Sequence, residues 1–254
     1  MKVARFTSGL LLGVLSATAA AHYPWLTLDS HLPSDGQPLS FEVGSGHSFP
    51  VDGTLSADRL ESLVVVGVQG EHAIALVEKA ERFTVEPALL EDAALLVGVQ
   101  RSSYYSRTPE GGRRGSKREF PDARSCSYSS NTVKAMVGSA MAAGAAGKPL
   151  GHAFEVLPEA GPGALSAGSV LPVRVLFHGK PWPGEVSAIY AGYEKAEGEA
   201  DYPVQVTTDV EGRVEIPLDR AGQWMLRVST SEPYPQAEVC DQLNYNATLT
   251  FAVR

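Results

Sequence analysis

Residues 204–228 read VQVTTDVEGRVEIPLDRAGQWMLRV, and this stretch indicates the fold class. It contains three short apolar or alternating runs, at 204–208, 214–216 and 224–228, each bounded by residues typical of turns. Asp209 and Gly212 lie between the first two runs, where such residues favour a tight connection between strands. The stretch therefore predicts consecutive β-strands.

The same pattern recurs over most of the chain, and sustained helical periodicity is nearly absent. Single helical turns are expected at 55–60 and 87–92. Short strands with frequent turns predict an all-β fold of β-sandwich type. The further expected strands are 39–43, 63–68, 73–77, 94–99, 133–137, 153–156, 170–178, 185–191 and 248–253.

A stretch rich in Pro, Gly, Ala and Ser, Leu157–Ser169, is typical of a linker. It predicts two β-sandwich domains, an N-terminal domain over 22–158 and a C-terminal domain over 168–254. The second resembles transthyretin and carboxypeptidase regulatory domains, a resemblance that implies no chemistry by itself.

The N-terminus is typical of a secretory signal peptide over residues 1–21. Lys2 and Arg5 precede a short apolar core, and small residues surround the predicted cleavage site after Ala21. The core is too short for a membrane anchor, and no other stretch reaches about 18 apolar residues, so we expect a soluble periplasmic protein. The alternative is an N-terminal helix that is retained in the fold.

The two cysteines, Cys126 and Cys240, are most simply explained by one disulfide bond in an oxidising compartment. The alternative is a pair of soft metal ligands. A formal net charge of −8 argues against nucleic-acid binding. The basic stretch 101–124 could bind an anionic partner, but a long solvated loop is the favoured interpretation.

Catalytic sequence templates are absent: there is no G-x-S-x-G, H-E-x-x-H or P-loop motif, and no G-x-G-x-x-G motif after a strand. A glycosidase uses two carboxylates that face each other across a cleft, and the sequence alone neither supports nor excludes such a pair. We therefore expect a protein that is not an enzyme.

Cleavage after Ala21 would make His22 the first residue, so its α-amine and imidazole could chelate one metal ion together. Cleavage one or two residues earlier would also leave a terminus that suits Cu(II) or Ni(II). His47 lies in a glycine-flanked loop before Pro50, where its ring could project into a shared site. The alternative for both histidines is an ordinary structural role, which is the favoured interpretation for each of the others, His31, His72, His152 and His178.

Several short motifs, in the same order along the chain, are similar to those of a known family. That family is the periplasmic NikM-like family of unknown function, formerly assigned to nickel uptake. The resemblance implies an exported all-β protein associated with divalent transition metals. It also implies that His22 and His47 are the positions that correspond to the family's functional residues. The chain departs from the family pattern in having Phe154 where Leu is usual, and in its cysteine pair. The motifs are AHYPWL (21–26), GHSFP (46–50), LGHAFEVLP (150–158), GKPWPGEV (179–186), TDVEGR (208–213) and AGQWML (221–226).

These observations predict a periplasmic protein that binds or delivers nickel, copper or cobalt, with a metal transporter or an outer-membrane receptor as its partner. The alternative is an envelope module that binds protein or glycan, in which Tyr104, Tyr105, Trp182 and Tyr190 would matter more than the histidines. A third interpretation, a histidine-brace copper oxidase, requires a terminal His22, a second histidine and an open site.

Overall fold

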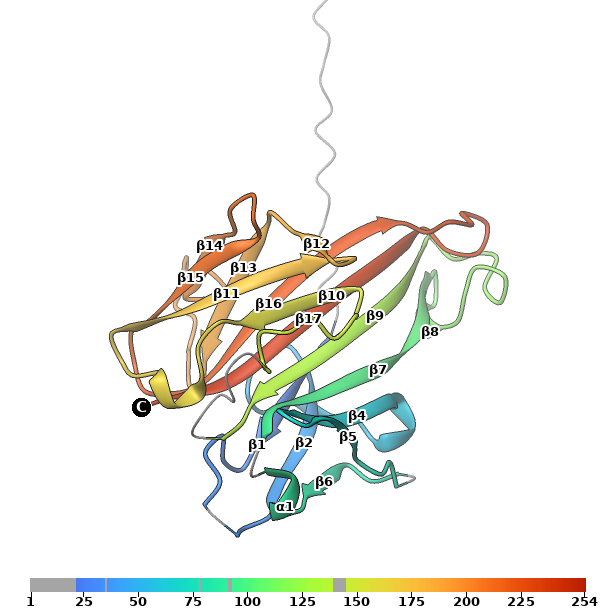
Figure 1. Ribbon diagram of the computed structural model, residues 1–254. Helices are drawn as coiled ribbons and strands as arrows, with labels where there is room; N and C mark the ends of the chain where they lie inside the picture. Colours follow the sequence, from blue (N-terminus) through green and yellow to red (C-terminus); the bar gives the residue numbers. More distant parts are fainter. Residues whose placement is uncertain (1–21, 35, 78, 91–92, 139–144) are drawn as a thin grey trace, which may run out of the picture.

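The computed structural model describes residues 22–34, 36–77, 79–90, 93–138 and 145–254. Within these residues the chain forms three β-sheets and only short helical turns, so the all-β prediction is confirmed (Figure 1). The signal peptide predicted over 1–21 lies outside the described residues. No helix in the described part of the chain is long and apolar enough to cross a membrane.

The largest sheet has nine strands and runs through the middle of the molecule. Its strand order is β14-β13-β16-β17-β9-β7-β4-β5, and β8 pairs with the far part of β7. The strands are β4 (Leu60–Gly67), β5 (Gly70–Ala73), β7 (Ala93–Thr108), β8 (Gly111–Arg114), β9 (Ser125–Met136), β13 (Glu185–Tyr190), β14 (Val204–Thr207), β16 (Gly222–Pro233) and β17 (Gln242–Val253).

Two smaller sheets cover this central sheet. The first comprises β1 (Tyr23–Leu28), β2 (Leu39–Gly46), β3 (Gly53–Thr54) and β6 (Arg82–Val85). The second comprises β10 (Phe154–Pro158), β11 (Ser169–Phe177), β12 (Lys180–Pro181) and β15 (Arg213–Leu218). The short helical turns are η1 (Ala57–Arg59), α1 (Pro87–Leu90) and η2 (Pro162–Ala164), and the first two lie within the two turns predicted from sequence.

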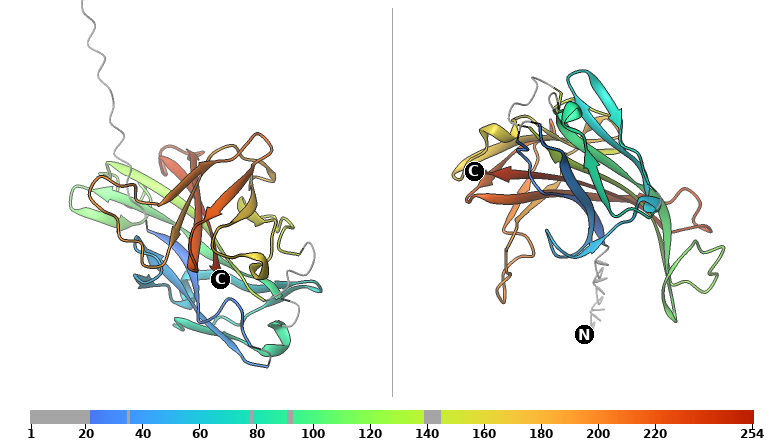
Figure 2. Two further views of the ribbon diagram at one scale, coloured as in Figure 1. Left: turned by 90° about the vertical axis from the view of Figure 1, so that its left-hand side faces the viewer. Right: turned by 90° about the horizontal axis from the view of Figure 1, so that it is seen from below.

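The two covering sheets lie on opposite faces of the central sheet (Figures 1 and 2). Side chains alternate between the faces of a strand, so neighbours on one strand enter different cores. On β7, Leu95 and Val97 pack in the core beneath the β10–β11 sheet, whereas Leu96 packs in the core beneath the β1–β2 sheet. On β9, Met136 and Ala135 divide in the same way. The molecule is thus a three-layered structure.

The central sheet joins the two regions predicted as domains. β17 pairs in parallel with β9 over nine residue pairs, from Gln242 opposite Ser127 to Thr250 opposite Ala135. β10 and β11, which flank the predicted linker, pair with each other in one covering sheet. The boundary between residues 158 and 168 therefore does not separate two sheets. The division into domains and the likeness to transthyretin stay predictions.

A buried ion pair fastens the β10–β11 sheet to the central sheet. Lys134 on β9 lies 2.7 Å from Glu155 on β10, and these side chains are 1% and 2% exposed. The backbone N–H groups of Leu150 and Gly151 also donate hydrogen bonds to the Glu155 carboxylate. Burial would raise the pKa of Glu155, but Lys134 and the N–H group of Leu150 hold that pKa below its ordinary value. A buried pair with these additional hydrogen bonds favours one arrangement of the two layers.

Four central strands extend beyond the covering sheets toward one end of the molecule (Figure 1). They are longer than the apolar runs predict, because β7, β9, β16 and β17 continue through polar residues. The basic stretch 101–124 is in part a hairpin, since 101–108 and 111–114 are strand residues, so the prediction of a loop over its whole length is wrong. The predicted disulfide bond, Cys126–Cys240, is confirmed and lies at this end.

The disulfide bond provides one test of the fold, because it links residues separated by 114 positions. We expect the Cys126→Ala/Cys240→Ala variant to lose roughly 2–5 kcal/mol of unfolding free energy, since the crosslink restricts the unfolded chain. Urea unfolding of the variant and the oxidised wild type measures this loss. Equal midpoints for the two proteins would contradict a stabilising crosslink.

His31 provides a second test, through the pH dependence of stability. Its ring is 4% exposed, its Nδ1 lies 2.8 Å from the carbonyl oxygen of Met136, and burial lowers its pKa to about 4. Because the neutral ring is favoured in the folded state, its contribution is complete above the unfolded pKa of 6.5 and is lost as the pH falls toward 4. The shift corresponds to about 3 kcal/mol.

We therefore expect wild-type stability to fall more steeply between pH 7 and pH 4 than that of His31→Gln, as measured by urea unfolding. His72→Gln is the matched control, because His72 is exposed on β5. Parallel pH profiles for wild type and His31→Gln would show that His31 is not held neutral.

Candidate metal centre

The pairing of β1 with β2 brings His22 and His47 together. These strands are antiparallel, and Tyr23, the first residue of β1, lies opposite Gly46, the last residue of β2. His22 directly precedes Tyr23 and His47 directly follows Gly46, so the two histidines come just past the last residue pair of the ladder. Their ring centroids are 4.4 Å apart and the ring planes are nearly perpendicular, at 88°. Both residues are exposed, so two imidazoles lie in contact at the open end of this ladder.

Asp52 holds the loop that carries His47. Its carboxylate accepts hydrogen bonds from the backbone N–H groups of His47, at 2.7 Å, and Ser48, at 3.2 Å. These two hydrogen bonds, together with the adjacent His22 and His47 side chains, lower the pKa of Asp52. Gly46 makes this arrangement possible, because a Cβ atom there would lie 2.1 Å from an oxygen of the Asp52 carboxylate.

The indole of Trp25 supports the same loop from beneath. Its Nε1 donates a hydrogen bond to the carbonyl oxygen of Pro50 at 3.1 Å, and its ring packs edge-on against Phe49. The ring also lies over Gly44, where a Cβ atom would be 2.4 Å from the indole nitrogen. The glycines and the Phe-Pro pair in this stretch thus fit the loop onto a buried aromatic side chain.

Tyr23 anchors the strand that begins after His22. The guanidinium of Arg227 lies 4.3 Å from the centre of the Tyr23 ring, and the Tyr202 hydroxyl donates a 2.8 Å hydrogen bond to the Tyr23 hydroxyl. Arg227 also donates a hydrogen bond to the Tyr202 hydroxyl, at 3.1 Å. Burial, reinforced by Tyr202, raises the pKa of Tyr23, so this phenol stays protonated. The Thr248 hydroxyl donates a hydrogen bond to the carbonyl oxygen of Pro24, which ties β1 to the central sheet.

The site offers two imidazoles and a nearby carboxylate that is already engaged with the backbone. Imidazole nitrogens bind first-row transition metals at about 2.0–2.1 Å, so rings in mutual contact are close enough to share one ion. Within the described ranges, no group of three or more His, Cys, Asp and Glu side chains is arranged to hold a metal ion. A complete ligand set would therefore need a further donor, such as the α-amine of His22.

The structure does not bring the other histidines to this site. His31 is buried behind β9, and His72 lies on β5. His152 is half-buried beside Lys134 and Glu155, and burial, with the charge of Lys134, lowers its pKa. His178 sits at the β11–β12 turn with its ring against Phe177 and Tyr245. Each of these four histidines has a separate environment.

Four residues of the site carry no signal in the sequence pattern: Asp52, Tyr23, Tyr202 and Arg227. Asp52 follows His47 by five residues in a loop, a spacing that matches no ligand motif. Tyr202 and Arg227 come from the distant second half of the chain. Only the paired register of β1 and β2 and the packing on the central sheet reveal these neighbours.

The role of Asp52 can be tested through the order of the loop. We expect Asp52→Ala to lower the ¹⁵N–¹H heteronuclear NOE of the backbone amides of residues 47–49, 51 and 52, because two charge-assisted hydrogen bonds are lost. Asp52→Asn retains an acceptor oxygen and should show a smaller decrease. Asp122→Ala, a change at an exposed aspartate elsewhere, should leave the loop unchanged. Unaltered values in Asp52→Ala would show that the loop does not depend on this clamp.

No curated protein matches the chain. A family model described as "Domain of unknown function (DUF4198)" matches residues 19–232, which include both histidines of the pair and most of the three-layered fold. The chain therefore belongs to the DUF4198 family.

Proposed function

We propose that this protein is a periplasmic, non-enzymatic protein that binds one transition-metal ion, Cu(II) or Ni(II), through His22 and His47 and delivers it to an uptake system. The observation that carries the proposal is the contact between the two imidazole rings, at 4.4 Å between centroids. Exposed imidazoles that face each other are suited to capture an ion from solution, since no buried charge has to be desolvated.

The third donor in this proposal is the α-amine of His22. Signal-peptide cleavage after Ala21 would create that amine next to the imidazole of the same residue. Amine and ring would then form a chelate, and His47 would complete a three-nitrogen set. Nitrogen donors of this kind favour Cu(II) over Ni(II) in intrinsic affinity, and cobalt binds more weakly than either.

The surroundings support this assignment. Asp52 provides negative charge beside the two rings, while one of its oxygens is held by the backbone N–H groups of His47 and Ser48. Tyr23 and Trp25 fix the two backbone segments that carry the histidines. A site held in this way loses little conformational entropy when an ion binds.

Export and the NikM-like assignment belong to the same proposal. The disulfide bond is compatible with an oxidising compartment such as the periplasm. The order of the AHYPWL and GHSFP motifs supports the NikM-like resemblance, in which the partner would be a metal transporter or an outer-membrane receptor. The proposed role is to bind and release the ion rather than to transform a substrate.

The test is calorimetric titration of Cu(II) and Ni(II) into protein whose chain begins at His22. We expect one ion per chain and tighter binding of copper. His22→Ala should weaken binding by on the order of a hundredfold, because it removes one ligand and the chelate ring, and His47→Ala by at least tenfold. Binding should also weaken as the pH falls, since imidazoles and amine must lose their protons.

Two controls make the result specific. His72→Ala removes an exposed histidine elsewhere and should leave the affinity unchanged. A chain with the additional residues Gly-Ser before His22 lacks the free amine at that residue and should bind the ion differently and more weakly. Undiminished binding in His22→Ala, or no binding by the wild type, would refute the proposal and favour an envelope-interaction role.

A further inference from the structure

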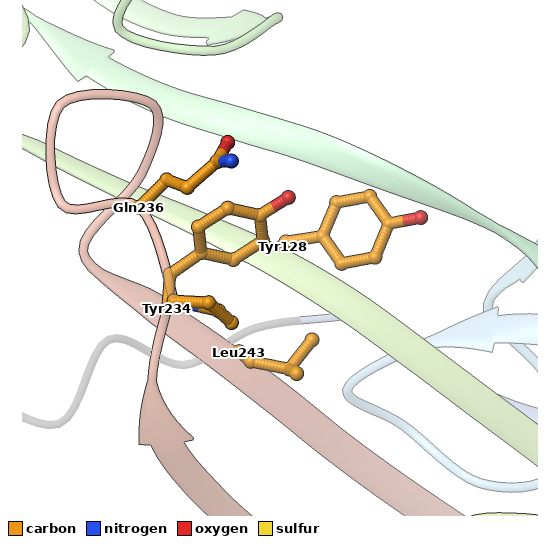
Figure 3. Close-up of a pocket in the computed structure, with 5 residues that line it drawn as sticks. Tyr128, Tyr234, Gln236 and Leu243 are labelled. Carbon is orange, nitrogen blue, oxygen red and sulfur yellow. The ribbon is translucent and has the colours of Figure 1, made fainter.

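A cluster of tyrosines lines a pocket on the extended end of the central sheet (Figure 3). The pocket has a volume of about 360 Å³ and is lined by Tyr128, Tyr234, Pro235, Gln236 and Leu243. Tyr104 adjoins it, with its ring 4.6 Å from that of Tyr128 and 5.8 Å from that of Tyr234. We call these residues the tyrosine shelf. The volume falls in the range of about 300–1,000 Å³ that is typical of small-ligand pockets.

The tyrosine shelf is on the opposite face of the central sheet from the histidine pair. Tyr128 lies on the same face of β9 as Lys134, because the two are separated by an even number of residues. Lys134 faces the β10–β11 sheet, whereas Thr248 on the other face contacts β1. A ligand on the shelf therefore would not contact His22 or His47.

The shelf is a built surface and not a mobile loop tip. The Cys126–Cys240 disulfide bond ties the end of β9 to the loop that carries Tyr234 and Gln236. Asp241 accepts a 2.8 Å hydrogen bond from the backbone N–H of Cys126 and also pairs with Lys117. These links hold the two sides of the pocket together before any ligand arrives, which reduces the entropy cost of binding.

The shelf presents both apolar ring faces and hydrogen-bonding groups, so it suits a ligand that has apolar surface and polar groups together. Tyr104 and Tyr234 share a hydrogen bond of 2.6 Å between their hydroxyl oxygens, and this bond raises the pKa of Tyr104 to about 12. The Tyr104 hydroxyl is therefore neutral. The ring faces provide apolar area, and the exposed Gln236 amide provides one donor group and one acceptor group.

The charges beside the shelf are already neutralised in pairs. Lys117 pairs with Asp241, and Arg118 pairs with Glu238 at 3.4 Å. A phosphate or an acidic peptide would have to break these pairs to find a cation. Glu232 lies opposite Leu243 in the strand register and is half-exposed. One oxygen of its carboxylate accepts a 3.4 Å hydrogen bond from the Tyr245 hydroxyl and lies 3.7 Å from Nε2 of His178. The shelf thus favours a neutral ligand that can donate hydrogen bonds.

We infer that the tyrosine shelf binds a neutral carbohydrate. Sugar rings present apolar C–H faces that pack on tyrosine rings, and hydroxyl groups that donate to Glu232 and both donate to and accept from Gln236. A proline-rich peptide also packs on aromatic rings, but its carbonyl groups only accept hydrogen bonds, so it could use neither the amide oxygen of Gln236 nor the second carboxylate oxygen of Glu232. The shelf therefore fits a polyhydroxylated ligand better than a peptide.

The experiment is calorimetric titration of the full chain with neutral hexasaccharides of glucose, of mannose and of N-acetylglucosamine, and separately with decaproline. We expect at least one hexasaccharide to bind. Tyr128→Ala should weaken this binding by about tenfold, because it removes a stacking surface, and Gln236→Ala by a smaller factor. Gln236 is exposed, so its variant should fold normally even if a tyrosine variant does not.

Tyr105→Ala is the matched control. Tyr105 follows Tyr104 on β7 and therefore points to the other face, where its hydroxyl lies over Gly112. This variant should bind the sugar as the wild type does. Binding of none of the three hexasaccharides, equal binding by Tyr128→Ala and wild type, or binding of decaproline instead would overturn the inference.

Discussion

The parallel pairing of β17 with β9 is the constraint on which the rest of this structure depends. It places the last strand of the chain in the middle of a sheet whose other half was formed about a hundred residues earlier. Once the two halves form one sheet, each of its faces must be covered, and the two smaller sheets do so. The strands in the middle are then apolar on both sides, as Leu95 and Leu96 demonstrate on β7.

This shared sheet also determines where ligands can reach the protein. The β1–β2 sheet is fixed to one face through Thr248 and Tyr23, so its open end presents His22 and His47 to solvent there. On the other face, beyond the β10–β11 sheet, Tyr128 and Tyr234 line the pocket of the tyrosine shelf. The two proposed sites are thus separated by the sheet itself, so a metal ion at one site would not contact a carbohydrate at the other.

Much of the fold could be predicted from local sequence, because apolar runs bounded by turn residues directly indicate β-strands. The disulfide bond also followed from a simple count of two cysteines. The β1 strand was not among the predicted strands, since Tyr23–Leu28 is buried almost throughout and shows no alternation. The outer halves of β9 and β17 were missed because polar residues such as Ser129 and Asn244 line them. The parallel pairing of β9 with β17 has no local signal at all.

The candidate site was predictable only in part. A histidine next to a cleavage site and a histidine in a glycine-rich loop were each visible, but nothing in their spacing shows that they meet. Electron spin echo spectroscopy of Cu(II)-loaded protein that begins at His22 tests this meeting most directly, because it counts the imidazoles bound to the ion. We expect two bound imidazoles in the wild type and one in His47→Ala. A single imidazole in both proteins would contradict this expectation.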